Sequence, residues 1–306
     1  MSTTFELALR GAGGEPVDLW RTLVSHGVAE LPPARIDEEA RTMEITLRTN
    51  GRARTVRVSE GKRGAAAVEI VGRKPAARDL ERLTAVVRHV LRLDEDLSQF
   101  YALAAEDPQL AWAATGAGRM VQSATVFEEV VKTVCTTNCT WSATERMVGA
   151  LVEHLGEPAP GAPPEGAHGR AFPTPIAMAE ASEEWYKDVA RTGYRGAYLR
   201  SLAASVVAGE IDLEELGSAS PDDLPDDEVE RRLLALPGVG PYAAAHVMML
   251  IGRYSRLILD SWTRPKYAKL NGSETVADTD IVARFEPYGR YAGLAFWLYL
   301  TQDWVP

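Results

Sequence analysis

The residues most able to carry chemistry lie in the segment 226–260, which holds two closely spaced glycines and ends on an aspartate. Gly238 and Gly240 flank Val239 between two stretches with helical spacing, and Pro241 suits the first turn of the second helix. Such a hairpin would leave backbone N–H groups free at a helix N-terminus, where the helix dipole favours a phosphate. The pattern predicts a site that binds DNA phosphates whatever the base sequence, although glycines between helices also form ordinary turns.

Asp260 follows Gly240 by 20 residues, and on its own it could be an ordinary helix N-cap. Together, LPGVGPYAA and this aspartate resemble the helix-hairpin-helix DNA glycosylase superfamily. The resemblance implies that Gly238, Val239 and Gly240 bind DNA and that Asp260 faces a flipped nucleotide as the catalytic carboxylate. Breaking a glycosidic bond builds positive charge on the sugar, which a carboxylate stabilises while it activates water.

Bifunctional members of that superfamily carry a lysine two residues after the second hairpin glycine, where it forms a Schiff base with the sugar. Here this position is Tyr242, which cannot form an imine. The resemblance therefore implies a monofunctional enzyme that leaves an abasic site. Lys266 and Lys269 lie one or two turns past Asp260, and we expect them to meet phosphates or solvent.

The resemblance extends to segments that would contact the DNA. Asn138 in TTNC matches an asparagine that fills the gap opposite the unpaired base in the 8-oxoguanine branch. Tyr194 in GYR matches that branch's inserted tyrosine, which places Arg195 and Tyr198 near the DNA. An inserted side chain partly offsets the stacking lost on extrusion. The alternative is that Tyr194 packs on the core.

The C-terminal helix departs from the 8-oxoguanine branch at the position that reads the base. A glutamine stands there in that branch, whereas this chain has Phe296. With Tyr242 and Trp262, Phe296 predicts an aromatic base pocket that suits alkylated purines through stacking and cation–π contacts. Alternatively, Phe296, Trp297 and Trp304 are core residues. Tyr242 is equally compatible with a thymine or uracil mismatch glycosylase, and another modified base or a non-catalytic damage-binding protein stays open.

Residues 1–78 predict a β-rich N-terminal module. Alternating residues indicate strands at 5–10, 43–49, 53–58 and 66–72, and Asn50-Gly51 is typical of a two-residue hairpin turn. Residues 17–27 between them have helical spacing. We expect a small antiparallel sheet with a helix on it.

Residues 79–306 predict a two-lobed helical body, so the fold class is mainly α with an N-terminal α+β module. Apolar spacing indicates helices at 79–93, 97–108, 126–156 and 176–193. A loop rich in proline and glycine is expected at 157–171, between the last two of these helices. An acidic loop is expected at 212–230, and the hairpin is expected to span 227–252.

The formal net charge of −10 at first argues against a nucleic-acid partner. However, nine acidic residues and no Lys or Arg lie between Asp212 and Glu230, so the rest of the chain is near neutral. We therefore expect a monomer that binds double-stranded DNA, in the cytoplasm and on the nucleoid, with no signal peptide, membrane span or cofactor.

Cys135 and Cys139 are too few for a metal site or an iron–sulfur cluster and suit packing better than redox chemistry. The resemblance would allow a monovalent cation at the hairpin backbone.

Overall fold

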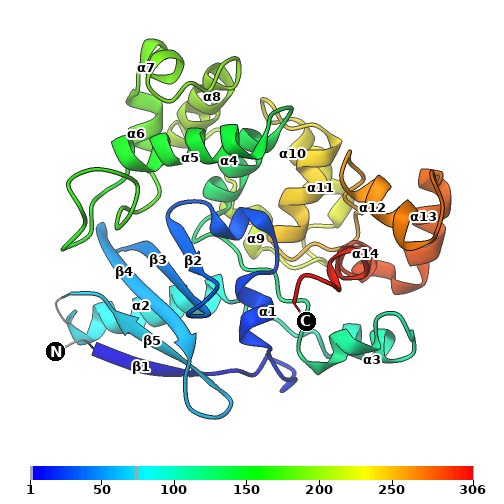
Figure 1. Cartoon of the computed structure of the whole chain (residues 1–306). Coiled ribbons are helices and arrows are strands. Elements are labelled where there is room, and N and C mark those ends of the chain that lie inside the picture. The colour runs from blue at the N-terminus through cyan, green and yellow to red at the C-terminus, as the bar shows by residue number, and fades with distance from the viewer. Residues whose placement is uncertain (1–2, 73–74, 306) are drawn as a thin grey trace.

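The computed structural model describes residues 3–72 and 75–305. Residues 1–2 and 306, at the outer ends of the two predicted domains, and residues 73–74 lie outside this description. Figure 1 shows a sheet on one side of the molecule and a larger group of helices on the other. The predicted fold class, a mainly helical body with an N-terminal antiparallel sheet, is confirmed. No helix in the described ranges is both long enough and apolar enough to cross a bilayer.

The N-terminal sheet is antiparallel and has the strand order β1-β5-β4-β3-β2. Its strands are β1 (Thr3–Ala8), β2 (Ala34–Asp37), β3 (Thr42–Thr49), β4 (Arg52–Glu60) and β5 (Ala65–Ile70). The predicted turn joins β3 to β4, because Asn50 and Gly51 adopt φ values of 51° and 70°. Two successive positive φ values match the twist of the flanking strands. The sequence reasoning missed β2, which is only four residues long.

Helix α2 (Ala77–Val90) belongs to the core of the sheet module. Its buried residues Leu83, Val87 and Val90 share one apolar cluster with side chains from the sheet, and α1 (Leu19–Leu23) contributes to the same cluster. The core of the module therefore continues past residue 78, into the first segment that the sequence reasoning assigned to the helical body.

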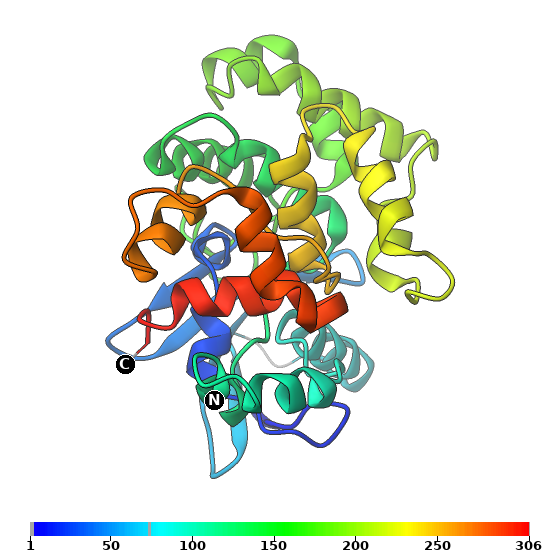
Figure 2. The same cartoon turned by 90° about the vertical axis from the view of Figure 1, so that its right-hand side faces the viewer.

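The remaining helices surround a second and larger apolar cluster. They are α3 (Ser98–Ala105), α4 (Val126–Thr136), α5 (Trp141–Leu155), α6 (Pro175–Glu180), α7 (Glu183–Asp188), α8 (Arg195–Val207), α9 (Glu214–Ser218), α10 (Asp226–Leu234), α11 (Pro241–Leu250), α12 (Thr263–Leu270), α13 (Asp278–Phe285) and α14 (Ala292–Thr301). Short 3-10 helices lie at Gly27–Glu30, Ala111–Thr115 and Glu286–Tyr291. Figure 2 shows α14 lying across the front of the helices that precede it.

Three predicted segments differ from the structure. The helix predicted at 176–193 is divided into α6 and α7. Residues 126–156 form two helices, because the chain turns at 137–140 and Asn138 adopts a left-handed φ of 47°. The stretch predicted as an acidic loop, 212–230, contains α9 and the first turns of α10. Acidic residues favour helix N-termini, which explains why this stretch is partly helical.

Arginines that follow the acidic stretch neutralise much of its charge. Arg232 pairs with Glu215 at 2.7 Å and with Glu228 at 2.8 Å. Arg253 pairs with Asp226 at 3.1 Å and is almost completely buried. The local field is therefore weaker than the count of acidic residues suggests.

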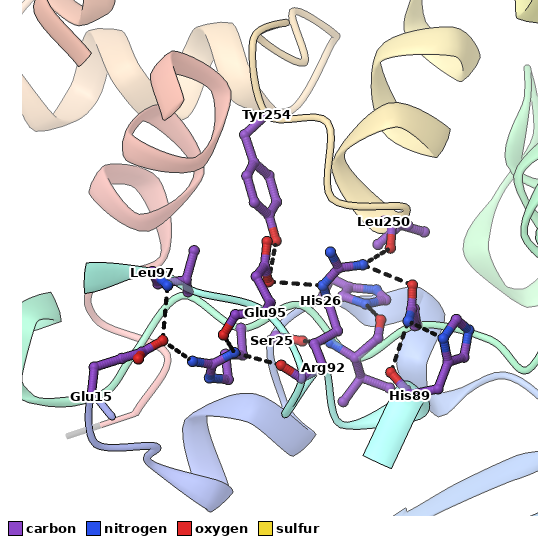
Figure 3. A network of polar contacts seen from close by, with 12 residues as sticks. Glu15, Ser25, His26, His89, Arg92, Glu95, Leu97, Leu250 and Tyr254 are labelled. Carbon is purple, nitrogen blue, oxygen red and sulfur yellow. Dashed lines mark hydrogen bonds and ion pairs between the residues drawn. The ribbon is translucent and has the colours of Figure 1, made fainter. Parts of the chain in front are cut away.

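A buried ion pair joins the first residues of the chain to the segment that follows α2. Arg119 is completely buried, pairs with Glu15 and donates to the backbone oxygen of Glu95 at 3.0 Å. Glu15 also accepts the backbone N–H of Leu97 at 2.8 Å (Figure 3). A buried charge requires this degree of pairing, because its desolvation is otherwise costly.

Arg92 extends these contacts to the end of α11. Its guanidinium pairs with Glu95 at 2.9 Å and donates to Gln122 at 2.7 Å and to the backbone oxygen of Leu250 at 3.1 Å. The Tyr254 hydroxyl donates to Glu95 at 3.0 Å (Figure 3). A cation at a helix C-terminus is favourable, so Arg92 holds the end of α11 against the rest of the molecule.

Replacing Gly252 is expected to destabilise the fold by disturbing Arg92. Gly252 has a φ of +87°, and a Cβ there would collide with the Arg92 guanidinium. The left-handed conformation alone costs a side chain about 1–2 kcal/mol. We expect Gly252→Ala to lower the free energy of unfolding by roughly 2–4 kcal/mol, because the displaced guanidinium also loses buried partners.

The measurement is urea unfolding followed by circular dichroism. Gly149→Ala is the matched control, since a Cβ there meets nothing within 4 Å and the position is helical. Alanine is the better helix former, so this variant should be unchanged or more stable. Equal stability of Gly252→Ala and the native chain would show that the contacts of Arg92 contribute little.

Candidate active site

The hairpin between α10 and α11 exposes its backbone to solvent at Gly240. Val239 is buried, and Gly238, with a φ of +80°, lies against Tyr198, whose Cδ2 would be 2.8 Å from an added Cβ. Gly240 is exposed, caps α11 and has nothing within 4 Å of an added Cβ. The open side of Gly240 and the N-terminal amides of α11 are thus available to a phosphate.

Asp260 holds the N-terminus of α12 through one of its two carboxylate oxygens. Oδ1 accepts the backbone N–H groups of Trp262 at 2.8 Å and Thr263 at 2.7 Å, and the Thr263 hydroxyl accepts the Asp260 N–H at 2.8 Å. Within the described ranges, no hydrogen bond reaches Oδ2. The capping role and the predicted catalytic role therefore do not compete, because capping fixes the carboxylate and leaves one oxygen free.

Tyr242 lies within electrostatic reach of Asp260. Its half-buried hydroxyl lies 3.3 Å from the Thr136 hydroxyl on α4. Burial is the main reason why the pKa of Tyr242 is raised; the contact with Thr136 lowers it, and the negative charge of Asp260 raises it. Lys266 is occupied elsewhere, since its Nζ pairs with Asp303 at 2.7 Å. The position that would need a lysine nucleophile thus holds a neutral phenol.

Three tryptophans pack together beside Asp260. The ring centroid of Trp262 lies 5.7 Å from that of Trp297 and 5.8 Å from that of Trp304. Trp262 and Trp304 are 40% and 41% exposed, whereas Trp297 is buried and donates its indole N–H to the backbone oxygen of Ser25 at 2.8 Å. This cluster offers an accessible aromatic surface next to the carboxylate.

Phe296 differs from its predicted place in the base pocket. It has no exposed surface and packs against Phe285 and Tyr267, with ring centroids 5.3 and 6.1 Å away. Its neighbour Trp297 packs against Trp262, two residues after Asp260. All ten residues of α14 are buried, so apolar periodicity could not show which of them points toward Asp260.

Asn138 and Tyr194 come together on the surface, as the predicted DNA contact requires. The Asn138 amide donates to the Tyr194 hydroxyl at 3.4 Å, and this hydrogen bond is the main reason why the pKa of Tyr194 is lowered. Tyr194 is 54% exposed, so it does not pack in the core. Both side chains belong to short connections at helix ends, beside the hairpin residue Gly238 that Tyr198 covers.

Arg195, predicted as a DNA contact, lies mostly beneath the surface. It is buried, donates to the Thr137 backbone oxygen, and its guanidinium carbon lies 4.6 Å from the Tyr194 ring centroid. Two of its three guanidinium nitrogens face Thr137 in the turn at 137–140. Arg195 therefore positions the turn against the tyrosine, and its predicted contact with DNA stays a prediction.

No protein-family model and no curated protein sequence matches the chain. Solved structures do match it along almost its whole length. A 3-methyladenine DNA glycosylase from Archaeoglobus fulgidus has a TM-score of 0.72 and 21% identity, with 98% of each chain covered. The chain has the helix-hairpin-helix glycosylase fold. The 8-oxoguanine glycosylase/lyase of Clostridium acetobutylicum in its apo form has a TM-score of 0.72 and 19% identity, again with 98% of each chain covered.

The same fold occurs in a DNA complex. The Clostridium enzyme bound to double-stranded DNA with cytosine opposite 8-oxoguanine has a TM-score of 0.70 and 18% identity, covering 94% of this chain and 92% of that chain. The hairpin of this fold and the helix that follows it can be identified in the chain. Its hairpin is α10–α11, and Asp260 lies at the N-terminus of the next helix.

The backbone of the hairpin can be tested with one added methyl group. Gly240→Ala should fold normally, because Gly240 has a φ of −100° and open space around it. If the amides bind phosphate, the methyl group keeps the backbone away, and we expect about tenfold weaker binding, or ~1.4 kcal/mol. Fluorescence anisotropy with an unmodified duplex at one fixed salt concentration measures this. Gly149→Ala adds the same methyl group elsewhere and should bind DNA as the native chain does. Equal affinities of all three proteins for the duplex would exclude phosphate binding by the hairpin.

Proposed function

We propose that the chain is a monofunctional DNA N-glycosylase, in which Asp260 stabilises the sugar cation and activates water. The observation that carries this proposal is the arrangement of Asp260, with one oxygen fixed by α12 and the other free, beside a tyrosine in place of a lysine. Binding to double-stranded DNA alone needs no carboxylate at this place, since it would repel the phosphates. The solved glycosylases with this fold support the same reaction class.

In the proposed reaction, the bond between C1′ of the sugar and the base nitrogen breaks, and its electron pair leaves with the base. The positive charge that develops on the sugar is stabilised by the free oxygen of Asp260. Water then adds its oxygen to C1′, and its proton passes to the carboxylate or solvent. The product is an abasic site in an uncut strand.

The proposed DNA contacts come from two places. Gly238 and Gly240 present backbone amides to a phosphate, and the buried Val239, whose N–H is donated to the Leu236 oxygen at 3.2 Å, anchors the turn between them. Asn138 and Tyr194 occupy the space left by the extruded nucleotide. Arg195 supports this second contact by holding the turn. One chain supplies all of these groups, so we propose that a monomer acts on double-stranded DNA.

Alkylated purines are the proposed substrates. Tyr242 and Trp262 remain the proposed pocket residues, and Trp297 takes the place predicted for Phe296. An electron-poor, alkylated ring gains from stacking on such aromatic faces. The Archaeoglobus fulgidus protein with this fold is a 3-methyladenine DNA glycosylase, which is consistent with this choice.

Asp260→Asn tests the catalytic role without removing the helix cap. The amide oxygen of asparagine can still accept the N–H groups of Trp262 and Thr263, so the free energy of unfolding should change little. The loss of the charge should slow base release about 10²–10³-fold. Mass spectrometry of free bases released from alkylated, oxidised, deaminated and mismatched duplexes measures this rate.

Asp260→Ala is the companion variant, since it loses both the charge and the cap, which is worth about 1 kcal/mol. Base release by Asp260→Asn at the native rate would exclude the catalytic role. Absence of base release by the native chain from every duplex would instead favour a damage-binding protein.

The absence of a lysine at position 242 leads to a separate expectation. Treatment with borohydride during the reaction reduces an imine to a stable protein–DNA adduct. We expect no adduct with the native chain and an uncut strand until the abasic site is cleaved by alkali. An adduct on a denaturing gel, mapped by mass spectrometry to any lysine, would contradict the monofunctional assignment.

A further inference from the structure

Two buried histidines lie beside the proposed base pocket. His246 follows Tyr242 by one turn of α11 and therefore lies on the same face of the helix, with ring centroids 5.7 Å apart. His26, from the segment after α1, meets His246 edge to face at 6.4 Å. Both side chains are buried, and neither belongs to the contacts of Asp260.

The histidines are connected to the tryptophan cluster from the other side. Ser25 precedes His26, and its backbone oxygen accepts the indole N–H of Trp297. Trp297 in turn packs on Trp262, two residues after Asp260. A continuous series of contacts thus runs from Tyr242 through the two histidines to the tryptophans beside Asp260.

Each histidine has a ring nitrogen without a partner. His26 Nε2 lies 2.7 Å from the Val121 backbone oxygen (Figure 3). A carbonyl oxygen only accepts, so Nε2 carries the hydrogen, and Nδ1 of the neutral ring is left as an acceptor. Within the described ranges, nothing hydrogen-bonds to His26 Nδ1 or to His246 Nε2, although both atoms are buried.

Both rings are neutral at physiological pH. Burial lowers the pKa of His246 to about 4. Burial also lowers the pKa of His26 to about 3; the Val121 hydrogen bond opposes this, and His246 and Lys132 add to it. Lys132 is itself paired with Glu128 at 2.6 Å. The two rings therefore offer lone pairs and carry no charge of their own.

We propose that His26 and His246 recognise the base, by accepting a hydrogen bond from an exocyclic amino group of an alkylated, adenine-type purine. This inference rests on the proposed function and adds the chemical group by which the substrate is selected. A buried acceptor without a partner costs free energy, which a donor on the ligand recovers. His26 Nδ1 is the fixed acceptor, and His246, whose tautomer no hydrogen bond fixes, adapts to the base.

This arrangement discriminates between bases by their polar edge. An alkylated purine that lacks the amino group would leave the acceptor unpaired, so its release should be slower even if it stacks equally well. Protonated imidazoles would present donors instead and repel a cationic ring. The low basicity of both histidines is therefore part of the selection.

The test removes the interaction from either side. Two duplexes carry N3-methyladenine or N3-methylpurine, in which a hydrogen replaces the amino group, at the same position. Single-turnover base release is measured for the native chain, His246→Leu, His246→Gln and His26→Phe. We expect the native chain to release the amino-bearing base about tenfold faster. This ratio should fall toward one in His246→Leu or His26→Phe and recover in His246→Gln, whose amide oxygen accepts.

His154→Leu is the matched control, since His154 is an exposed residue of α5 that packs against Trp185. It should keep both the rate and the ratio. Circular dichroism shows which variants fold, and each folded variant is compared with the native chain by the ratio, which a general loss of stability does not change. A native ratio near one, or an unchanged ratio in every folded Leu or Phe variant, overturns the proposal.

The outcomes separate this inference from the proposed function. Equal release of both methylated bases leaves the glycosylase intact and removes the role of the histidines. Release of neither, with release of another base from the duplex panel, removes the alkylpurine assignment together with this inference. Release of no base at all from any duplex refutes the glycosylase itself.

Discussion

The C-terminal end of α11 is held by a buried arginine, and the geometry of the site depends on this contact. Arg92 donates to the Leu250 backbone oxygen and pairs with Glu95, which also accepts the Tyr254 hydroxyl. Burial alone would lower the pKa of Arg92, but the negative charge of Glu95 and the hydrogen bond to it raise the pKa above its ordinary value. The guanidinium is therefore charged although buried, and its partners in the helical body and beside the sheet are fixed together.

This contact matters because α11 carries functional groups at its other end. Its N-terminus begins at the hairpin, and one of its faces carries Tyr242 and His246. Because a helix is rigid, fixing its C-terminal end at Leu250 also fixes the positions of Tyr242 and His246 relative to Asp260. The N-terminal module contributes His26 and the Ser25 oxygen, so it takes part in the proposed base pocket in addition to supporting the helical body.

The sequence predicted the parts of the fold and site that depend on local rules. The turn at Asn50-Gly51, the α10–α11 hairpin and the position of Asp260 before a helix all follow from the backbone preferences of neighbouring residues. The burial of Phe296 and the contact of Arg195 with Thr137 could not be predicted, because the resemblance gave the positions of these residues but not the direction of their side chains.

Contacts between distant segments were beyond local rules. The pairing of Arg119 with Glu15 joins residues that are 104 positions apart, and nothing in either local sequence indicates the partner. The approach of His26 to His246 is of the same kind. His246 alone left a local signal, because it lies one helical turn after Tyr242, but its burial beside a second histidine depends on how the module docks.

The tryptophan cluster gives the site an optical property. Trp262 and Trp304 are accessible, whereas Trp297 is shielded and hydrogen-bonded, so the three indoles differ in their surroundings although their rings touch. A purine that stacked on Trp262 would cover part of its exposed indole, and the emission of an indole depends on its surroundings. The entry of a base next to Asp260 would therefore change the intrinsic fluorescence of the protein, which makes extrusion observable in time without a label on either molecule.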